Sequence, residues 1–244
     1  MFEITFVGTG DAFGSGGRRN TSILVRGPEG VLLLDCGPTT PYGLRQLGID
    51  PREIDAIAIS HFHGDHVAGV PFLLLDFQFE LGREKPLQIL GPESIAQRIR
   101  DMTSIFAYEA SQERPYALGF TEYQAGEPLQ AAGFQITPMP ALHHPQTHPH
   151  MLRVQNDTRA LVFSGDTGWH DELPDKVGDV NLFIAECVFY EEKFEYHLSH
   201  ERMSEQRCRF SCDATILTHI GREVLDERDR LQFDTSEDGT RITL

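Results

Sequence analysis

The sequence has few cysteines, and none of the four forms a CxxC pair. A chain of 244 residues can build a substantial hydrophobic core, so it does not need disulfides to fold. Small secreted proteins rely on much denser cysteine frameworks. The scarcity therefore predicts free thiols and a reducing, cytoplasmic location.

Long apolar runs are also missing. No stretch approaches the about 20 apolar residues that a membrane-spanning helix requires. The chain opens with alternating apolar and polar residues (Phe2, Ile4 and Phe6), which indicates a strand, and it lacks the basic start and apolar run of a signal peptide. Linkers, low-complexity segments and short repeats are absent from the sequence. We therefore expect one domain over residues 1–244 and no membrane partner.

Positive charge is scarce, because 21 Lys and Arg stand against 37 Asp and Glu and give a formal charge of −16. A surface of this kind repels nucleic-acid phosphates unless a local basic patch or bound cations offset the charge. Part of the acidic excess could be carboxylates that bind metal ions. The balance therefore disfavours a nucleic-acid-binding role for this chain on its own.

The sequence does contain many short strand-like runs. They lie at residues 2–7, 21–26, 30–35, 54–60, 134–138, 151–155, 159–164, 181–186 and 214–218. Apolar residues at helical spacing predict a helix over 92–108, and Ser199 is a suitable N-cap for another. Residues 111–133 are rich in Gly and Pro, and we expect them to be irregular. The pattern predicts a mixed α/β domain with sheet buried under helices.

The clearest chemical signal is the segment HFHGDH, which directly follows a strand-like run. His61 and His63 alternate at a strand end, so their side chains leave on the same side. Gly64 permits a sharp turn, after which Asp65 and His66 can aim at a neighbouring point. Imidazole and carboxylate ligands suit zinc, and also iron or manganese. The segment therefore predicts a metal site.

Further candidate ligands lie at the ends of later strand-like runs, where sites in α/β proteins are usually built. They are His143 and His144, then Asp166 in SGDT, then His219 in LTHI. Each taken alone could be an ordinary loop residue. Because all of them follow an apolar run in the same way, we expect them to complete the metal site.

These motifs resemble the metallo-β-lactamase superfamily, whose HxHxDH motif is matched in full by His61, His63, Asp65 and His66. The segments VGTGDAFGSGGRRNTS, SGDT, LTH and EDGTRITL are similar, in order, to the ribonuclease Z-like branch, and the resemblance covers nearly the whole chain. It implies a four-layer αββα sandwich and a hydrolase with two divalent metal ions. Zinc is the expected ion, with Mn²⁺ or Fe²⁺ as alternatives.

The resemblance also implies roles for individual residues. The first metal would be held by His61, His63 and His144, the second by Asp65, His66 and His219, and Asp166 would bridge the two. His144 is preferred to His143 because His144–Pro145 resembles the third-histidine segment of the family. His148 and His150 stay open as ligands or substrate contacts.

The segment YHLSH resembles the family's His-Leu/Met-Ser/Thr segment, whose histidine stabilises the transition state or protonates the leaving group. This assigns His197 as catalytic and Glu186 as the residue that orients it, and Asp65 would also orient a hydroxide shared by the metals. A structural His197 and a surface Glu186 are the alternatives. His200 could cap or line the following helix.

The resemblance favours hydrolysis of a small or cyclic phosphodiester. The stretch between His144 and Asp166 is too short for the arm with which ribonuclease Z grips tRNA, so tRNA is disfavoured as a partner. A carboxylic ester, lactone or thioester hydrolase is one alternative, and a ribonuclease Z-like nuclease that needs a partner is another. A redox di-iron protein is disfavoured, because His63 stands where such proteins carry a carboxylate. The implied partner is a small anionic substrate, and a homodimer is compatible with the resemblance.

Overall fold

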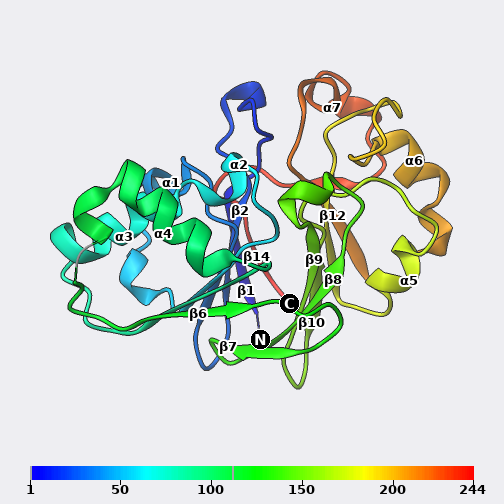
Figure 1. Cartoon of the computed structure of the whole chain (residues 1–244). Coiled ribbons are helices and arrows are strands. Elements are labelled where there is room, and N and C mark those ends of the chain that lie inside the picture. The colour runs from blue at the N-terminus through cyan, green and yellow to red at the C-terminus, as the bar shows by residue number, and fades with distance from the viewer. Residues whose placement is uncertain (1, 112) are drawn as a thin grey trace.

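The computed structural model describes residues 2–111 and 113–244, which form two facing seven-stranded sheets (Figure 1). The first sheet has the order β14 (Arg241–Thr243), β1 (Glu3–Gly8), β2 (Ser22–Arg26), β3 (Val31–Leu34), β4 (Ala56–Ala58), β5 (Leu87–Gly91) and β6 (Leu118–Glu122). The second has the order β13 (Asp234–Thr235), β12 (Ala214–Thr218), β11 (Leu182–Glu186), β10 (Ala160–Phe163), β9 (His150–Gln155), β8 (Phe134–Pro140) and β7 (Leu129–Ala131).

Helices cover the outer face of each sheet, as Figure 1 shows. The first sheet carries α1 (Thr40–Gln46), α2 (Gly64–Val67), α3 (Val70–Leu75) and α4 (Ile95–Phe106). The second carries α5 (Leu173–Val177), α6 (His200–Glu205) and α7 (Arg222–Asp226). The four layers confirm the predicted αββα sandwich.

The central strands are buried on both faces, which explains why they read as apolar runs. In β2, Leu24 packs under the helices, whereas Ile23 and Val25 pack against the second sheet. In β3, Leu33 packs under the helices and Leu34 packs against the second sheet. Each buried aliphatic side chain of this kind contributes about 1.5–3 kcal/mol relative to exposure. The double burial therefore holds the strand ends, and the site built on them, in fixed positions.

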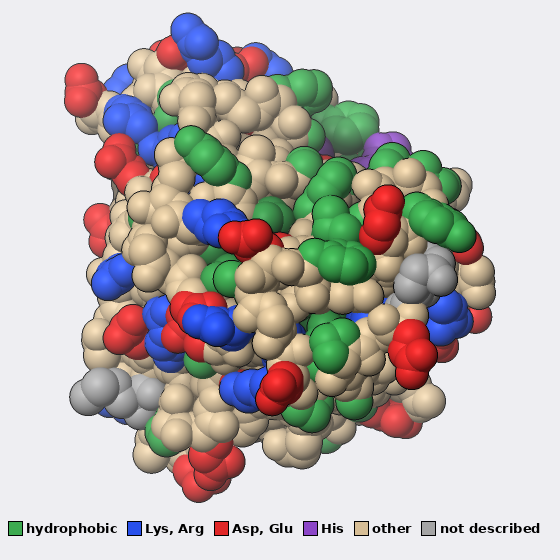
Figure 2. Space-filling model, turned by 90° about the vertical axis from the view of Figure 1, so that its left-hand side faces the viewer, with side chains coloured by type: hydrophobic (Ala, Val, Ile, Leu, Met, Phe, Trp, Pro, Cys, Tyr) green, Lys and Arg blue, Asp and Glu red, His purple; other side chains and the backbone are tan. Residues whose placement is uncertain are grey.

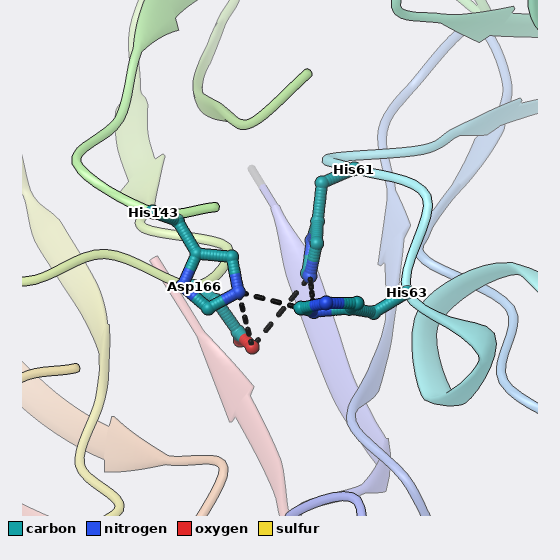
Figure 3. Close-up of side chains that lie close together, drawn as sticks. All are labelled: His61, His63, His143 and Asp166. Atoms are coloured by element: carbon teal, nitrogen blue, oxygen red, sulfur yellow. Dashed lines mark hydrogen bonds and ion pairs between the residues drawn. The ribbon is translucent and has the colours of Figure 1, made fainter. Parts of the chain in front are cut away.

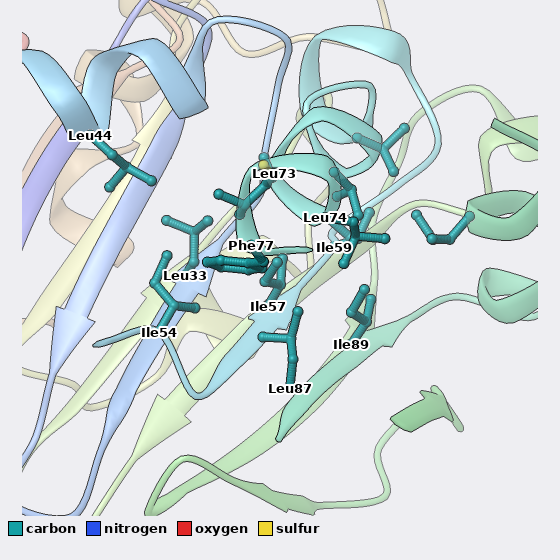
Figure 4. Packing of buried hydrophobic residues seen from close by; sticks show 14 of the residues in the cluster. Leu33, Leu44, Ile54, Ile57, Ile59, Leu73, Leu74, Phe77, Leu87 and Ile89 are labelled. Carbon is teal, nitrogen blue, oxygen red and sulfur yellow. The ribbon is translucent and has the colours of Figure 1, made fainter. Parts of the chain in front are cut away.

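The core under the first helical layer is shown in Figure 4. Leu33, Ile57 and Ile89 from the sheet meet Leu73 of α3 and Phe77, which follows it. Between the sheets, Phe2 and Phe134 pack edge to face with ring centroids 5.2 Å apart. A third core lies under α5, α6 and α7.

The outer surface of α3 and α4 carries exposed apolar side chains, which gather on the face drawn in Figure 2. Phe72, Ile105 and Phe106 are among them, and the rings of Phe72 and Phe106 stack 6.4 Å apart. The expectation of a homodimer stays a prediction. Among the described residues, no helix has both the length and the apolarity of a membrane span.

Most predicted elements are present with shifted bounds. The helix expected over 92–108 is α4, and Ser199 caps α6 by accepting a hydrogen bond from the Arg202 amide at 3.2 Å. The expectation that 111–133 is irregular is wrong, although residue 112 lies outside the described part. This region contains β6 and β7, the outermost strands of the two sheets. Their exposed faces and Gly119 weakened the apolar pattern by which strands are detected.

Candidate functional site

The site lies where β3 and β4 of one sheet end opposite β10, β11 and β12 of the other. The β3–β4 pair is parallel, as are the β10–β11 and β11–β12 pairs, so within each sheet these strands end at a common edge. The segment after β4 carries HFHGDH into α2. Polar side chains from both sheets are thereby brought together at one edge of the sandwich.

Backbone contacts fix the turn that carries this motif. The Cys36 amide donates to the His66 carbonyl at 2.7 Å, and the His66 amide donates to the His63 carbonyl at 3.1 Å. Gly37 lies so close that a Cβ there would be 1.9 Å from the Asp65 carbonyl oxygen. The close approach requires glycine, and it holds Asp65 and His66 against the end of β3.

A first group of side chains consists of His61, His63, His143 and Asp166 (Figure 3). The Nδ1 atom of His63 lies 3.1 Å from Nε2 of His61 and 3.0 Å from Nε2 of His143. Asp166 Oδ2 lies 3.6 Å from His61 Nε2 and 3.9 Å from His143 Nε2. The four potential ligand atoms all lie within 4.8 Å of one another.

A second group consists of Asp65, His66 and His219. His66 Nε2 lies 3.2 Å from His219 Nε2, and Asp65 Oδ2 lies 3.2 Å from each of these nitrogens. Asp166 Oδ1 lies 3.2 Å from His66 Nε2 and 3.5 Å from His219 Nε2. Asp166 therefore presents one oxygen to each group.

The structure places His143, not His144, in the first group, which corrects the choice made from the sequence. The His143 ring is buried, and its Nδ1 donates to the Tyr196 carbonyl at 2.8 Å. His144 precedes Pro145 and packs beside the Tyr196 ring at 4.7 Å, while its ring centroid is 5.9 Å from that of His63. Neighbouring side chains leave the backbone in different directions, so only one of the two can turn inward.

The charges in the two groups depend strongly on one another. Burial would lower the pKa of His66, but Asp166, Asp65 and Asp35 outweigh it and raise the pKa well above its usual value. Burial would raise the pKa of Asp65, but His66 and His219 hold it well below its usual range. Burial lowers the pKa of His143 to about 4, which leaves this imidazole neutral. The carboxylates therefore stay ionised and need positive charge beside them.

The donor set fits divalent metal ions. The Nδ1 atoms of His61, His66 and His143 each face an outer partner, so their Nε2 atoms point into the groups. A neutral imidazole donates from one nitrogen only, and metal-binding histidines usually donate from the other ring nitrogen to an outer acceptor. Within the described residues, buried Asp166 Oδ1 and His219 Nδ1 have no hydrogen-bond partner. Inward-facing lone pairs at 3.0–3.2 Å repel one another unless a cation or a proton lies between them.

Beside these groups, Glu186 and His197 form a dyad at the end of β11. Buried Glu186 accepts from His197 Nδ1 at 2.7 Å and from the Thr167 amide at 3.0 Å. Burial would lower the pKa of His197, but Glu186 outweighs it and raises the value to about 9. The His197 ring lies 5.9 Å from the ring of His219. The structure thus brings both predicted residues to the site.

The other histidines left open by the sequence lie outside the groups found in the described residues. His200 Nε2 accepts from the Gln232 amide at 2.9 Å and its ring stacks on Tyr190, so it packs α6 against its neighbours. His150 Nδ1 donates to the His148 carbonyl at 2.8 Å. The His148 ring lies beside Phe62 with centroids 6.1 Å apart, so His148, His150 and His200 all have structural surroundings.

A cavity of about 230 Å³ opens over the two groups. It is lined by Asp11, Ala12, Phe13, His63, Gly64, Asp65, Asp166, Val188, His197 and His219, with no Lys or Arg among them. Arg18 donates instead to Thr9 and to the Ser236 carbonyl, and Arg19 to the Val7 carbonyl, so both arginines have structural roles. A larger hollow of about 640 Å³ around Gln135 and Gln155 contains no histidine. The smaller cavity is therefore the candidate active site.

Asp35, Ser60, Asp11 and Phe13 are residues of the site that the sequence analysis did not select. Asp35 ends an apolar run, as Asp166 does, and this signal could have singled it out. Asp11 accepts hydrogen bonds from the amides of Phe13 and Ser15 at 3.1 and 2.9 Å. These bonds fix the loop that holds exposed Phe13 at the cavity.

Comparisons with known proteins agree with this geometry. Ribonuclease Z of Methanothermobacter thermautotrophicus is 34% identical over 198 residues, which cover 77% of this chain and 63% of the relative. The chain thus spans less than two thirds of that relative's length. The metallo-β-lactamase fold protein YhfI from Bacillus subtilis superposes with a TM-score of 0.80 at 19% identity, covering 100% of both chains. A diphosphatase of the PhnP family gives 0.79 at 17% identity, covering 100% of this chain and 98% of the other.

A family model adds a narrower assignment. The model described as "Anti-Pycsar protein Apyc1" matches residues 2–232, nearly the whole chain. The fold, the histidine and aspartate groups and the ribonuclease Z relative place the chain in the metallo-β-lactamase superfamily, among ribonuclease Z-like proteins. Within that superfamily, the chain belongs to the Anti-Pycsar protein Apyc1 family.

Proposed function

We propose that this chain is a hydrolase that uses two divalent metal ions to cleave a small or cyclic phosphodiester. The observation that carries the proposal is the position of Asp166, whose two oxygens face different groups of ligands. One carboxylate placed in this way can bridge two cations. The family is named for an anti-Pycsar protein, and we propose that this chain is likewise an anti-Pycsar protein.

In the proposed site, the first ion would be held by His61, His63 and His143 and the second by Asp65, His66 and His219, with Asp166 shared. Zinc is the expected ion, because imidazole and carboxylate ligands suit it. Bound divalent cations would supply an activated water near neutral pH and would neutralise charge that develops on the phosphoryl group. Asp65 would also orient the attacking water, since its side chain lines the cavity.

His197 is suited to protonate the leaving oxygen. Glu186 occupies its Nδ1, so the Nε2–H is the donor left for the cavity. With its pKa raised to about 9, the imidazole is protonated at neutral pH. A proton donor matters most for a basic alkoxide leaving group. This dyad therefore suits a phosphodiester whose leaving group is a basic alkoxide.

The cavity favours a small substrate with a single negative charge. Its volume of about 230 Å³ is below the range of about 300–1,000 Å³ typical of drug-sized ligands. Because no Lys or Arg lines it and Asp11 does, a monoester dianion would be bound less well than a diester monoanion. Ala12, Phe13 and Val188 offer apolar contacts to the organic part of the substrate.

A ribonuclease Z-like activity on RNA is the second candidate, favoured by the 34% identity to a ribonuclease Z. Against it, the chain between His143 and Asp166 forms only a short helical turn, Pro145–Thr147, and the β9–β10 pair. The formal charge of −16 also disfavours a large polyanion.

The test is an activity panel on zinc-loaded protein with bis-p-nitrophenyl phosphate, p-nitrophenyl phosphate, a lactone and a thioester. We expect the diester to be cleaved with the highest kcat/KM and the monoester much more slowly. Preference for the lactone or thioester would overturn the phosphodiester proposal, and faster cleavage of the monoester would overturn the charge argument.

A further inference from the structure

Asp35 is a buried carboxylate behind the site and has no part in the mechanism above. It follows β3, and its side chain is fully shielded from solvent. Its Oδ2 lies 2.7 Å from His66 Nδ1 and 2.7 Å from Ser60 Oγ, and its Oδ1 accepts from the Ser60 amide at 2.7 Å. Ser60 Oγ in turn lies 3.0 Å from His61 Nδ1. The carboxylate thus reaches one histidine of each group, the second one through a hydroxyl.

The directions of these hydrogen bonds follow from what each group can do. A carboxylate only accepts, so both the Ser60 hydroxyl and His66 Nδ1–H must donate to Asp35. The Ser60 hydroxyl has a single proton, and that proton is used on Asp35. Its oxygen can therefore only accept from His61, which places the His61 proton on Nδ1. As metal ligands, both imidazoles would be neutral, with their Nε2 lone pairs pointing into the two groups.

We propose that Asp35 is a positioning residue that fixes the tautomers of His61 and His66 and so prepares both metal sites together. The inference rests on the proposed function, since it assumes that the two groups bind metal ions. His143 and His197 do not depend on this carboxylate, because His143 is held by the Tyr196 carbonyl and His197 by Glu186. Asp35 is thus a connection between the two sites that lies behind their ligands.

Backbone geometry shows that Asp35 and Ser60 are held tightly in place. Asp35 has φ of 57°, a left-handed conformation that costs free energy in a non-glycine residue and persists where surrounding contacts impose it. Its amide donates to the Ala58 carbonyl at 2.9 Å. On the other side, Gly165 packs so closely that a Cβ there would lie 2.8 Å from Ser60 Cβ. Ser60 therefore has little room to turn away from Asp35.

Asp35→Asn is the sharpest test, because it keeps the shape and changes only the polarity. If the amide nitrogen faces Ser60 Oγ and His66 Nδ1, it donates to both and drives the imidazole protons to the metal-facing Nε2 atoms. If the amide nitrogen faces the backbone N–H of Ser60 instead, two hydrogen-bond donors point at each other and that bond is lost. Either orientation disturbs the arrangement. We expect both metal affinities to fall by about 10–100-fold, the usual effect of losing an outer-shell partner of metal ligands.

Two further variants separate positioning from general destabilisation. Ser60→Ala removes the link to His61 and one hydrogen bond to Asp35, but it keeps the bond between Asp35 and His66. It should therefore weaken the site of His61 and leave the other near the wild-type affinity. Ser22→Ala is the matched control: its buried hydroxyl donates to the backbone carbonyl of Asp35 at 2.8 Å, not to the carboxylate. Ser22→Ala should leave both affinities unchanged.

The affinities are measured by titrating metal-free protein with Co²⁺ against a competing chelator, with the visible absorption of the bound ion reporting each site. Circular dichroism of every metal-free variant verifies folding. If Asp35→Asn does not fold, the site-selective loss in Ser60→Ala carries the test. Unchanged affinities in Asp35→Asn, or equal losses in Ser60→Ala and Ser22→Ala, would overturn the inference. Wild-type protein that binds fewer than two ions would instead overturn the proposed function.

Discussion

His143 and His144 have identical side chains on neighbouring residues, yet the structure gives them different surroundings. His143 is buried between His63 and the Tyr196 carbonyl, whereas His144 is partly exposed beside the Tyr196 ring. We predict that His143→Ala lowers the affinity for one metal ion by at least about tenfold, whereas His144→Ala keeps the wild-type affinity. Metal titration of both variants measures this. A larger loss in His144→Ala would return the assignment to that residue.

This pair shows what the sequence could and could not predict about the site. The spacing in HFHGDH restricts where His61, His63 and His66 can point, because alternation and one sharp turn leave few options. After β8, by contrast, the chain leaves regular structure, and no periodicity says which of two successive histidines turns inward. The Glu186–His197 pair was found only through family resemblance, since no local pattern joins them.

The protonation of His197 gives a second prediction at this scale. Its pKa of about 9 means that the donor form is present below that pH and is lost above it, and nearby cations would lower the value. We therefore expect kcat/KM for a diester to fall on the basic side, with a midpoint at or below about pH 9. The pH profile of His197→Ala should lack this decrease on the basic side. The variant should also lose about 10²–10⁴-fold in kcat/KM with an alkoxide leaving group, but much less with p-nitrophenolate.

His200→Ala is the control for His197→Ala, because His200 packs α6 against its neighbours and does not line the cavity. That variant should keep the pH profile of the wild type. Equal losses of the His197→Ala variant on activated and unactivated diesters would remove the proton-donor role.

At the scale of elements, the loop between β1 and β2 is held by the far end of the chain. Asp238 accepts hydrogen bonds from the amide and hydroxyl of Thr9 at 2.9 and 2.8 Å and from the amide of Arg19 at 2.8 Å. This loop carries Asp11 and Phe13 to the cavity. The segment before β14 therefore shapes the site without touching it.

We predict that Asp238→Ala lowers the free energy of unfolding by about 2 kcal/mol, because it leaves partly buried donors without their charged acceptor. Hydrogen exchange of the amides in residues 9–20 should become faster. Urea denaturation and exchange mass spectrometry measure the two effects. Asp157→Ala is the control, since that side chain is exposed and its loss should stay within about 0.5 kcal/mol. Equal stabilities of the two variants would contradict the role given to Asp238.

The elements themselves were predictable to the degree that burial imposes a pattern on them. Strands such as β3 and β10 are buried on both sides and read clearly as apolar runs. The edge strand β6 and the short helices α1 and α3 were missed. A helix of one or two turns, such as Thr40–Gln46, is too short for a convincing periodicity, and tertiary packing stabilises it more than intrinsic propensity does.

At the scale of the whole molecule, charge limits the partner. The formal charge of −16 works against binding of a large polyanion, and the described residues between His143 and Asp166 form only the turn Pro145–Thr147 and the β9–β10 pair. We predict that the zinc-loaded chain does not mature precursor tRNA at physiological salt, even at concentrations that cleave a small diester. Efficient cleavage at the tRNA 3′ side under those conditions would show that the fold alone suffices for RNA recognition.

We propose that two bound ions act together in phosphodiester hydrolysis. The most direct measurement titrates metal-free protein with Zn²⁺ and follows bound metal and bis-p-nitrophenyl phosphate hydrolysis in the same samples. Because Asp166 offers one oxygen to each group, we expect activity to reach its plateau only at two ions per chain. Full activity without added metal, or a plateau at one ion per chain, would contradict it.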